Sequence, residues 1–304
     1  MGKLQDFVEN NFNIVLLISI ALGIAFEQLQ QLPDYTVIVL IGIMIFFSCS
    51  NVSAHDVKNI NRKQFIIFYV SRYLVLPIVF YYLSLFVVPE YALGILLICL
   101  IPAGITSTAL VNIMEGNTSF AFIFTILTSV LAPFALPFLV VLLTDESTPI
   151  EPLNMFVTLC YAIFLPSVLY FFFVRKTKKV KKWVQDQSKM VPILLMGFVI
   201  SILISSQRHY FFENIETVFF AVFLGCILYA LLYMVGWFYA LPFDFKEKKT
   251  YAICSGANNL GLAAGLALLY FSPLIILFTA LAEISWVLGL AVFKNFVDYK
   301  EKIL

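Results

Sequence analysis

The chain has 304 residues, of which 62% are hydrophobic and only 12% are charged, and its mean hydropathy is +0.97. Soluble domains of this size carry about 25% charged residues, so the composition excludes an ordinary soluble protein and indicates one embedded in lipid. The net charge of +1 leaves no basic surface of the size that binding to nucleic acid requires.

The chain opens with a mixed polar stretch over residues 1–11. This stretch lacks the charged segment and the small-residue cleavage site of a signal peptide, so we expect the first apolar run to be retained. The cysteines all fall within apolar stretches, without the spacing of a metal site or a disulfide framework, and are interpreted as small buried hydrophobic residues. They are Cys49, Cys99, Cys160, Cys226 and Cys254.

Ten apolar runs follow along the chain, and a membrane-spanning helix needs roughly 17–25 apolar residues. The sequence therefore predicts an all-α polytopic membrane protein with about ten transmembrane helices, which form a single transmembrane domain over residues 1–304. The runs cover residues 12–30, 35–52, 65–88, 91–113, 118–143, 153–174, 190–207, 215–241, 250–271 and 273–293.

Lysine and arginine gather on the cytoplasmic side of membrane proteins, which orients the chain. With the N-terminus inside, 17 of the 19 basic residues fall in inner segments, whereas Arg208 lies outside and Arg72 lies within the third helix. The outer loop with Asp145, Glu146 and Glu151 is purely acidic. Both termini are therefore expected in the cytoplasm, in an inner or plasma membrane. The inner basic residues are Lys3, Lys58, Arg62, Lys63, Arg175, Lys176, Lys178, Lys179, Lys181, Lys182, Lys189, Lys246, Lys248, Lys249, Lys294, Lys300 and Lys302.

The fifth–sixth loop divides the runs into two sets of five, and an odd number per set predicts inverted repeats at about 12–144 and 152–294. The fourth helix is interrupted at Pro102-Ala103-Gly104, before Thr106, Ser107 and Thr108, and the ninth at 255–259. Proline and glycine favour unwinding, and nearby hydroxyls and amides can pair the freed backbone groups. Broken helices at matching places predict a binding site at the middle of the membrane, and hence a secondary transporter.

Two adjacent asparagines lie in the ninth-helix break. The pattern GxxxG over residues 261–265 is explained by close helix packing alone. Packing does not explain Asn258 and Asn259, because amides at membrane depth are costly unless they bind a ligand or bridge helices. We therefore expect polar residues of both breaks to contribute to the binding site.

Three motifs in this order resemble the bile acid:sodium symporter family over about residues 10–295. They are Pro102–Thr108, Leu131-Ala132-Pro133 and Gly256–Ala263. The resemblance implies a panel domain and a core domain, with the fourth and ninth helices crossing at their unwound centres. It also implies alternating access for small organic anions, with substrate meeting the crossing near Ile105, Thr106, Asn258 and Asn259.

In that family two sodium ions sit behind the crossing. By position, the first site would use Ser107, Thr108, Ala121, Thr125 and Cys254, and the second Arg72, Cys254 and Asn258. This chain departs from the family's pattern at four of these positions. Cys254 stands where the family has an acidic residue, Arg72 where it has a glutamine, Ala121 where it has a hydroxyl and Thr108 where it has an amide.

These departures weaken both sodium sites. A neutral thiol is a poor ligand for a hard cation, and a guanidinium cannot be deprotonated and repels a sodium ion beside it. We therefore expect a carrier without the usual sodium coupling and without a cofactor, for which a proton is the candidate coupling ion. In this hypothesis Arg72 supplies the missing positive charge at the crossing; the alternative is that Arg72 extends to the cytoplasmic surface.

Glu283 is the second intramembrane charge, in the tenth helix. It is either a proton-coupling carboxylate, a partner of a polar group between helices or a neutral structural group.

Other functions remain open to different degrees. An enzyme is not expected, because the two histidines lie in loops on opposite sides and no Ser-His arrangement is present. A channel or a solute sensor on the same fold, and a sodium symporter with a rebuilt ion site, are the alternatives. The expected partners are a small organic anion and the lipid bilayer, with the chain acting as a monomer or weak oligomer.

Overall fold

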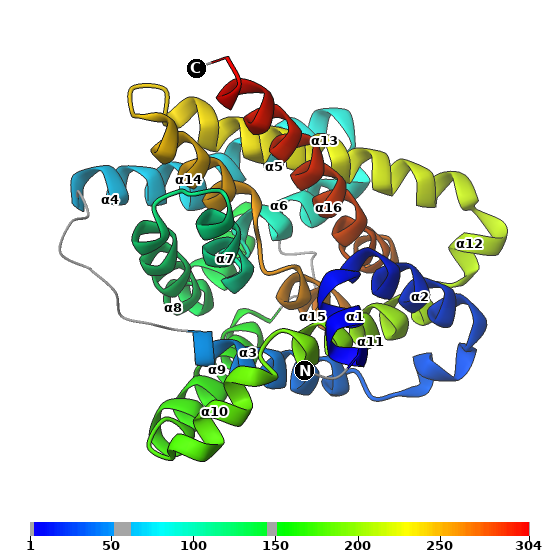
Figure 1. Cartoon of the computed structure of the whole chain (residues 1–304). Coiled ribbons are helices and arrows are strands. Elements are labelled where there is room, and N and C mark those ends of the chain that lie inside the picture. The colour runs from blue at the N-terminus through cyan, green and yellow to red at the C-terminus, as the bar shows by residue number, and fades with distance from the viewer. Residues whose placement is uncertain (1–2, 52–61, 145–150, 304) are drawn as a thin grey trace. The chain divides into compact units, whose positions relative to one another are not determined.

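The computed structural model describes residues 3–51, 62–144 and 151–303, and within these ranges the regular elements are helices, joined by one isolated β-bridge (Figure 1). Lys58, His55 and the acidic pair Asp145-Glu146 lie outside the described residues. Five helices in the described ranges are long and apolar enough to cross a membrane. They are Arg62–Val87, Thr118–Leu143, Pro152–Val174, Ile215–Tyr239 and Pro273–Glu301.

A sixth span arises if the helices Lys178–Asp186 and Met190–Ser206, bent by 53°, count as one. Shorter apolar helices cover Phe12–Ala25, Tyr35–Ser48, Pro89–Leu100 and Leu260–Tyr270. The chain is therefore an all-helical, polytopic membrane protein, whereas the total of ten spans in inverted repeats stays a prediction.

Two of the inner basic segments contain helices. Residues 178–186 form α10 (Lys178–Asp186), and Lys246, Lys248 and Lys249 lie in the first turns of α14 (Phe245–Gly256). Lysine and glutamate have good helix propensity, but helices rich in them contain no long apolar run and so are not indicated by hydropathy. Lys249 is moreover only 5% exposed and forms an ion pair of 2.7 Å with Glu301.

The chain divides into two compact units, each with segments from both sequence halves. Unit 1 comprises Met1–Ser53, Thr144–Ile215 and Gly261–Ala280; unit 2 comprises Ala54–Leu143, Glu216–Leu260 and Leu281–Leu304. Unit 1 contains α1 (Lys3–Asn10), α2 (Phe12–Ala25), η1 (Glu27–Gln31), α3 (Tyr35–Ser48), η2 (Cys49–Asn51), α9 (Pro152–Leu169), η6 (Tyr170–Val174), α10, α11 (Met190–Ser206), α12 (His209–Glu213), most of α15 (Leu260–Tyr270) and the start of α16 (Pro273–Glu301).

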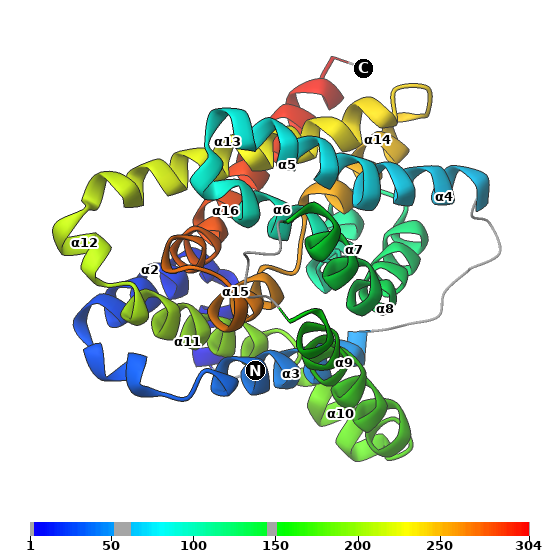
Figure 2. The same ribbon diagram turned by 180° about the vertical axis from the view of Figure 1, so that it is seen from behind.

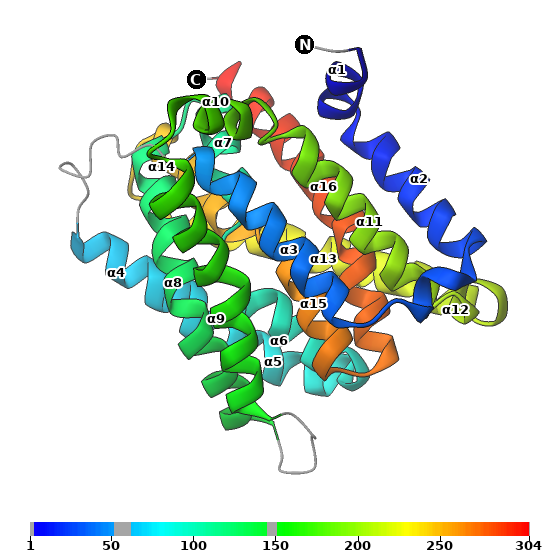
Figure 3. The same cartoon turned by 90° about the horizontal axis from the view of Figure 1, so that it is seen from below.

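Small residues let the helices of unit 1 approach closely. In Figure 3, α2 runs beside α11, and α3 runs beside α9. Where α2 meets α11, Gly23 and Gly197 face the partner helix and the Ser201 hydroxyl donates to the Ser19 carbonyl at 2.8 Å. Close backbone approach at small residues is how apolar helices gain packing energy in lipid, where no hydrophobic force drives them together.

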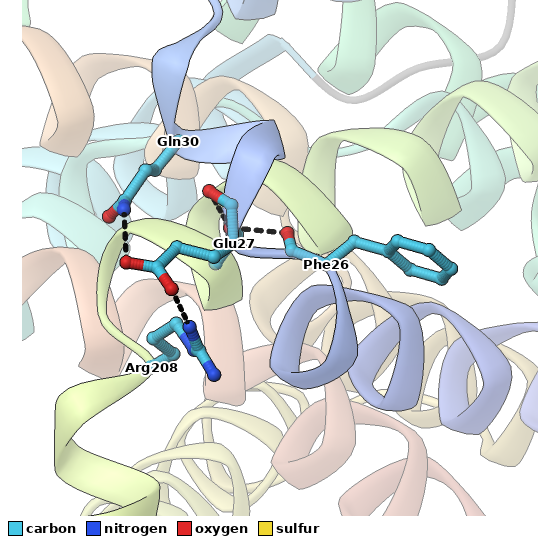
Figure 4. Close-up of polar contacts among 5 residues, drawn as sticks. Phe26, Glu27, Gln30 and Arg208 are labelled. Atoms are coloured by element: carbon cyan, nitrogen blue, oxygen red, sulfur yellow. Dashed lines mark hydrogen bonds and ion pairs between the residues drawn. The ribbon is translucent and has the colours of Figure 1, made fainter.

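A cluster of polar residues lies at one end of the α2–α11 pair. The Glu27 carboxylate pairs with the Arg208 guanidinium and accepts a hydrogen bond from the Gln30 amide at 3.3 Å (Figure 4). The Ser205 hydroxyl donates to the Phe26 carbonyl at 2.9 Å. The side chains of Glu27 and Arg208 are 58% and 28% exposed, so their ion pair is a solvent-screened surface contact.

Unit 2 contains α4 (Arg62–Val70), η4 (Ser71–Val75), α5 (Leu76–Val87), η5 (Pro89–Tyr91), α6 (Ala92–Leu100), α7 (Ile105–Ile113), α8 (Thr118–Leu143), most of α13 (Ile215–Tyr239), α14 and the end of α16. The first three form one continuous helix (Figure 2), whose middle, η4, is a π-helical turn. Pro77 explains this turn, because a proline has no N–H and its ring clashes with the carbonyl four residues earlier.

Aromatic rings fill the interior of unit 2. Phe68 lies 4.6 Å from Tyr251 and 5.0 Å from Phe124, measured between ring centroids, and Phe120 lies 4.6 Å from Tyr251. These rings join α4, α8 and α14 in one packed core, and such contacts add to the stability that apolar burial provides.

The glycine contact between α2 and α11 gives a direct test. A Cβ added at Gly23 would lie 2.7 Å from the Ser201 carbonyl oxygen and 2.8 Å from the Ile204 Cβ. Gly23→Ala should therefore destabilise the protein by about 1–3 kcal/mol through overpacking, measured as a lower melting temperature in detergent.

Gly42 in α3 is the matched control, because an added Cβ would meet nothing within 4 Å. Gly42→Ala should leave the melting temperature unchanged or raise it slightly, since alanine is the better helix former. Equal effects of the two substitutions would contradict the close packing of α2 on α11.

Candidate functional site

Two broken helices meet inside unit 2. The first break separates α6 from α7 at residues 101–104, and the second separates α14 from α15 at residues 257–259. The Gly104 N–H donates to the Ala257 carbonyl at 2.8 Å, and the Asn259 N–H donates to the Pro102 carbonyl at 2.9 Å. This antiparallel bridge pairs backbone groups that the breaks release from their helices, as groups at membrane depth require.

Gly104 permits this close approach of the two chains. A Cβ at this position would lie 3.0 Å from the carbonyl oxygen of Asn258 and 3.3 Å from its carbonyl carbon. On the other side of the first break, the Ala103 N–H donates to the Thr128 hydroxyl at 3.2 Å. The unwound segment is therefore fixed by α8 as well as by the second break.

Arg72 lies at the centre of the crossing. Its side chain is 0% exposed, and it projects from the π-helical turn η4. Nε donates to the Ser255 carbonyl at 2.9 Å, and Nη1 donates to the Cys99 carbonyl at 2.8 Å. Nη2 donates to the Asn258 side-chain oxygen at 3.2 Å. The guanidinium thus braces the crossing and does not extend to a surface.

The two carbonyl acceptors belong to the last turns of α6 and α14. Carbonyls in the last turn of a helix have no partner within the helix, and the aligned peptide dipoles give this end a partial negative charge. The Arg72 guanidinium therefore satisfies two such ends with one positive charge. The ring of Tyr73 lies 4.8 Å from the guanidinium carbon and adds a cation–π contact.

The guanidinium has no acidic partner in the described part of the chain. The ion pairs there are Arg208–Glu27 and Lys249–Glu301, and neither involves Arg72. A buried charge without a counter-ion is costly, so the converging helix ends and Asn258 must provide its compensation.

Asn258 connects the same groups. Its side-chain oxygen accepts from Arg72, and its side-chain nitrogen donates to the Ile98 carbonyl at 2.8 Å. Asn258 is 5% exposed, so both ends of the amide are used inside unit 2. Of the residues expected to meet substrate, Thr106 is exposed and Asn259 is half-buried, whereas the side chain of Ile105 lies outside the described residues.

The hydroxyls assigned to the first sodium site pair with each other. The Ser107 and Thr125 hydroxyl oxygens lie 2.9 Å apart, and the Thr125 hydroxyl donates to the Ala121 carbonyl at 2.9 Å. Cys254 is fully buried, and Thr108 is half-buried. Glu283 is 6% exposed and lies in α16.

Two residues that hold the broken helices and their neighbours together were not predicted from the sequence. Thr128 holds the first break, and its position one turn after Thr125 on the same helix was the available signal. Asn117 links the α7–α8 turn to α14, since its N–H donates to the Thr250 hydroxyl at 2.7 Å and its amide donates to the Glu247 carboxylate at 2.8 Å. The adjacent Gly116 was its only local sign.

The chain also matches a known protein family. The model of the SBF-like CPA transporter family matches residues 10–288. The chain belongs to this family. The resemblance inferred from the three motifs is thereby confirmed, and family membership makes the chain a membrane transporter with a small-molecule substrate.

Two curated relatives support the assignment to the SBF-like CPA transporters. A Bacillus subtilis (strain 168) protein described as the uncharacterized sodium-dependent transporter YocS is 29% identical over 282 residues, which cover 90% of this chain and 86% of that protein. The probable sodium/metabolite cotransporter BASS1, chloroplastic, of Arabidopsis thaliana is 23% identical over 222 residues. That match covers 69% of this chain and about half, 52%, of the plant protein.

The bracing role of Arg72 predicts a large loss of stability when it is removed. Arg72→Met keeps an unbranched side chain but leaves two helix-end carbonyls and the Asn258 oxygen without their donor. Unsatisfied buried groups cost about 1–3 kcal/mol each, and removal of a buried charge offsets part of that cost, so we expect a net loss of roughly 2–4 kcal/mol, seen as a lower melting temperature in detergent.

Arg208→Met is the matched control, since it removes the surface pair with Glu27 and a cation–π contact with Phe212. Such pairs contribute at most about 1 kcal/mol, so this variant should melt close to the wild type. Indistinguishable melting temperatures for Arg72→Met and the wild type would contradict the brace.

Proposed function

We propose that this transporter moves a small organic anion by alternating access, and that Arg72 rather than a bound sodium ion supplies the positive charge at the crossing. The single observation that carries the proposal is the set of Arg72 hydrogen bonds to the Cys99 and Ser255 carbonyls. A cation fixed at two helix ends provides the charge compensation that a bound metal cation would otherwise provide.

The residues at the sodium positions support the same conclusion. Cys254 offers a neutral thiol where a hard cation prefers oxygen ligands. The Ser107 and Thr125 hydroxyls satisfy each other, so no ligand is needed to explain their burial. Loss of an anion at position 254 and gain of a cation at position 72 act in the same direction, because both disfavour a second cation nearby.

Charge favours an anionic substrate. A fixed guanidinium without a carboxylate partner in the described residues leaves a positive potential around the crossing. The exposed Thr106 hydroxyl lies in the first turn of α7, where the partial charge of the helix end is also positive. A carboxylate is the substrate group that both features would attract.

The proposed membrane arrangement is ten spans in two inverted repeats, with both termini in the cytoplasm of an inner or plasma membrane. Helices occupy most of each of the ten apolar runs, with the fourth and ninth interrupted, and each compact unit draws on both halves of the chain. The excess of basic residues on one side supports the orientation.

A sodium symporter with a rebuilt ion site is the second candidate. Both relatives carry names that describe them as a sodium-dependent transporter or a sodium/metabolite cotransporter, which is the observation that favours it. The two candidates differ in one measurable property, the binding of sodium to the folded wild-type protein.

Thermal stability in sodium distinguishes them. The purified protein in detergent is melted while sodium chloride replaces choline chloride at constant ionic strength. We expect no sodium-specific shift, since a ligand that binds the folded state at hundredfold excess over its Kd would stabilise it by roughly 2.7 kcal/mol. A saturable, sodium-specific rise of the wild-type melting temperature would overturn the proposal.

Reverting two of the four departures from the family's pattern tests whether sodium binding can be restored. Arg72→Gln combined with Cys254→Glu restores the residue types that the resemblance implies, and this double variant should gain a sodium-specific rise. Arg208→Gln, which changes an arginine of unit 1 that pairs with Glu27, should behave as the wild type. In proteoliposomes, uptake of a panel of radiolabelled carboxylates should be lost in Arg72→Gln, and unchanged uptake would contradict the role of Arg72.

A further inference from the structure

Glu283 is a buried acid that the crossing does not use. Its side chain is 6% exposed in α16, and within the described residues its carboxyl has neither a hydrogen bond nor a cationic partner. An isolated carboxylate at membrane depth is strongly unfavourable, and taking up a proton removes that cost. A group in this situation is either a permanent neutral acid or a site that loads and unloads a proton.

The helix packed against Glu283 brings a second unused polar group. The Ser285 hydroxyl donates to the Val222 carbonyl at 2.9 Å, and Gly225 contacts the Ser285 side chain, so α16 and α13 are in close contact here. One helical turn beyond Gly225 is Tyr229, which is 0% exposed and whose hydroxyl has no hydrogen-bond partner among the described residues.

The buried Tyr229 hydroxyl interacts electrostatically both with Glu283 and with groups of the crossing. The titratable and charged groups within electrostatic reach of its hydroxyl are Glu283 from α16, Tyr233 from α13 itself, Cys99 from α6 and Arg72 from η4. Among these only Arg72 carries a fixed charge. A phenol can donate a hydrogen bond to a carboxylate and can also accept one, so an unpaired Tyr229 hydroxyl is able to respond when Glu283 changes its protonation state.

We propose that Glu283 is the binding site of the transported proton and that Tyr229 couples its protonation to Arg72. The proposal rests on the proposed function, in which sodium does not drive transport. With the proton bound, Glu283 is neutral and Arg72 stays on the helix-end carbonyls. When the proton leaves, the Glu283 carboxylate attracts the guanidinium and weakens its hold on the crossing.

The charge balance of this cycle follows directly. One proton and one monocarboxylate anion cross together, the Arg72 charge stays with the protein, and no net charge moves. Uptake of a monocarboxylate should therefore follow a pH gradient and be insensitive to the membrane potential.

The test uses infrared difference spectroscopy on the full-length protein in detergent, and it needs no substrate. We expect a carbonyl-stretching band of a protonated carboxylic acid that is lost in Glu283→Gln and disappears reversibly as the pH is raised while the protein stays folded. Tyr229→Phe and Arg72→Gln should each shift the pH at which the band disappears. The matched control is Glu90→Gln, which changes an exposed acid of the same unit and should leave the band unchanged.

A band that persists at every pH at which the protein is folded would assign Glu283 a structural role and overturn the proposal, as would a band retained in Glu283→Gln. If neither Tyr229→Phe nor Arg72→Gln shifts the pH at which the band disappears, the proposed coupling of Glu283 to Arg72 is overturned. Sodium-dependent melting reports separately on the proposed function, so absence of the band together with an absent sodium shift would refute the proton site alone.

Discussion

The Arg72 guanidinium carries a fixed positive charge and lies where two helices are interrupted. The arrangement of unit 2 depends on how that charge is accommodated. The Arg72 guanidinium finds its acceptors on carbonyls that the breaks have left without partners. The broken helix ends need a donor, and the buried cation needs acceptors. The guanidinium satisfies the free carbonyls, and the carbonyls compensate its charge, so neither would be stable alone at membrane depth.

This mutual dependence explains why the surrounding polar groups are paired among themselves. Asn258 bridges the guanidinium and the Ile98 carbonyl, and Thr128 holds the Ala103 N–H. The Ser107 and Thr125 hydroxyls form a hydrogen bond with each other. The two extended segments then pair as a short antiparallel bridge, which is compatible with lipid because its N–H and C=O groups face one another.

A fixed cation also changes what must move during transport. In the proposed cycle the guanidinium stays with the protein, whereas a bound metal ion would arrive and leave, so a separate group would carry the driving ion. Glu283 lies in the same unit and is deeply buried, and the neighbouring helix α13 carries Tyr229, whose hydroxyl has no hydrogen-bond partner among the described residues. The combination of a permanent positive charge and a neutralisable acid within one packed unit is a physically consistent basis for coupling without sodium.

The apolar helices, their breaks and the family could be predicted from the sequence, because each depends on short stretches of neighbouring residues. The length of an apolar run indicates a helix in lipid, and Pro102, Gly104 and the Asn258-Asn259 pair mark where a helix cannot continue. The helical state of residues 178–186 and of the start of α14 was missed, since charged helices leave no apolar run.

Only the tertiary structure decided the partners. Arg72 bonds to groups 27, 183 and 186 residues away in the chain, and the alternative of a side chain extending to the surface could not be excluded without them. The contact of Thr128 with Ala103, the pairing of Lys249 with Glu301 and the lack of a partner for the Tyr229 hydroxyl among the described residues likewise appear only after folding. The physical reason is that helix formation is set by neighbouring residues, whereas a buried polar side chain is stabilised by whichever distant groups the packed helices bring within hydrogen-bonding distance.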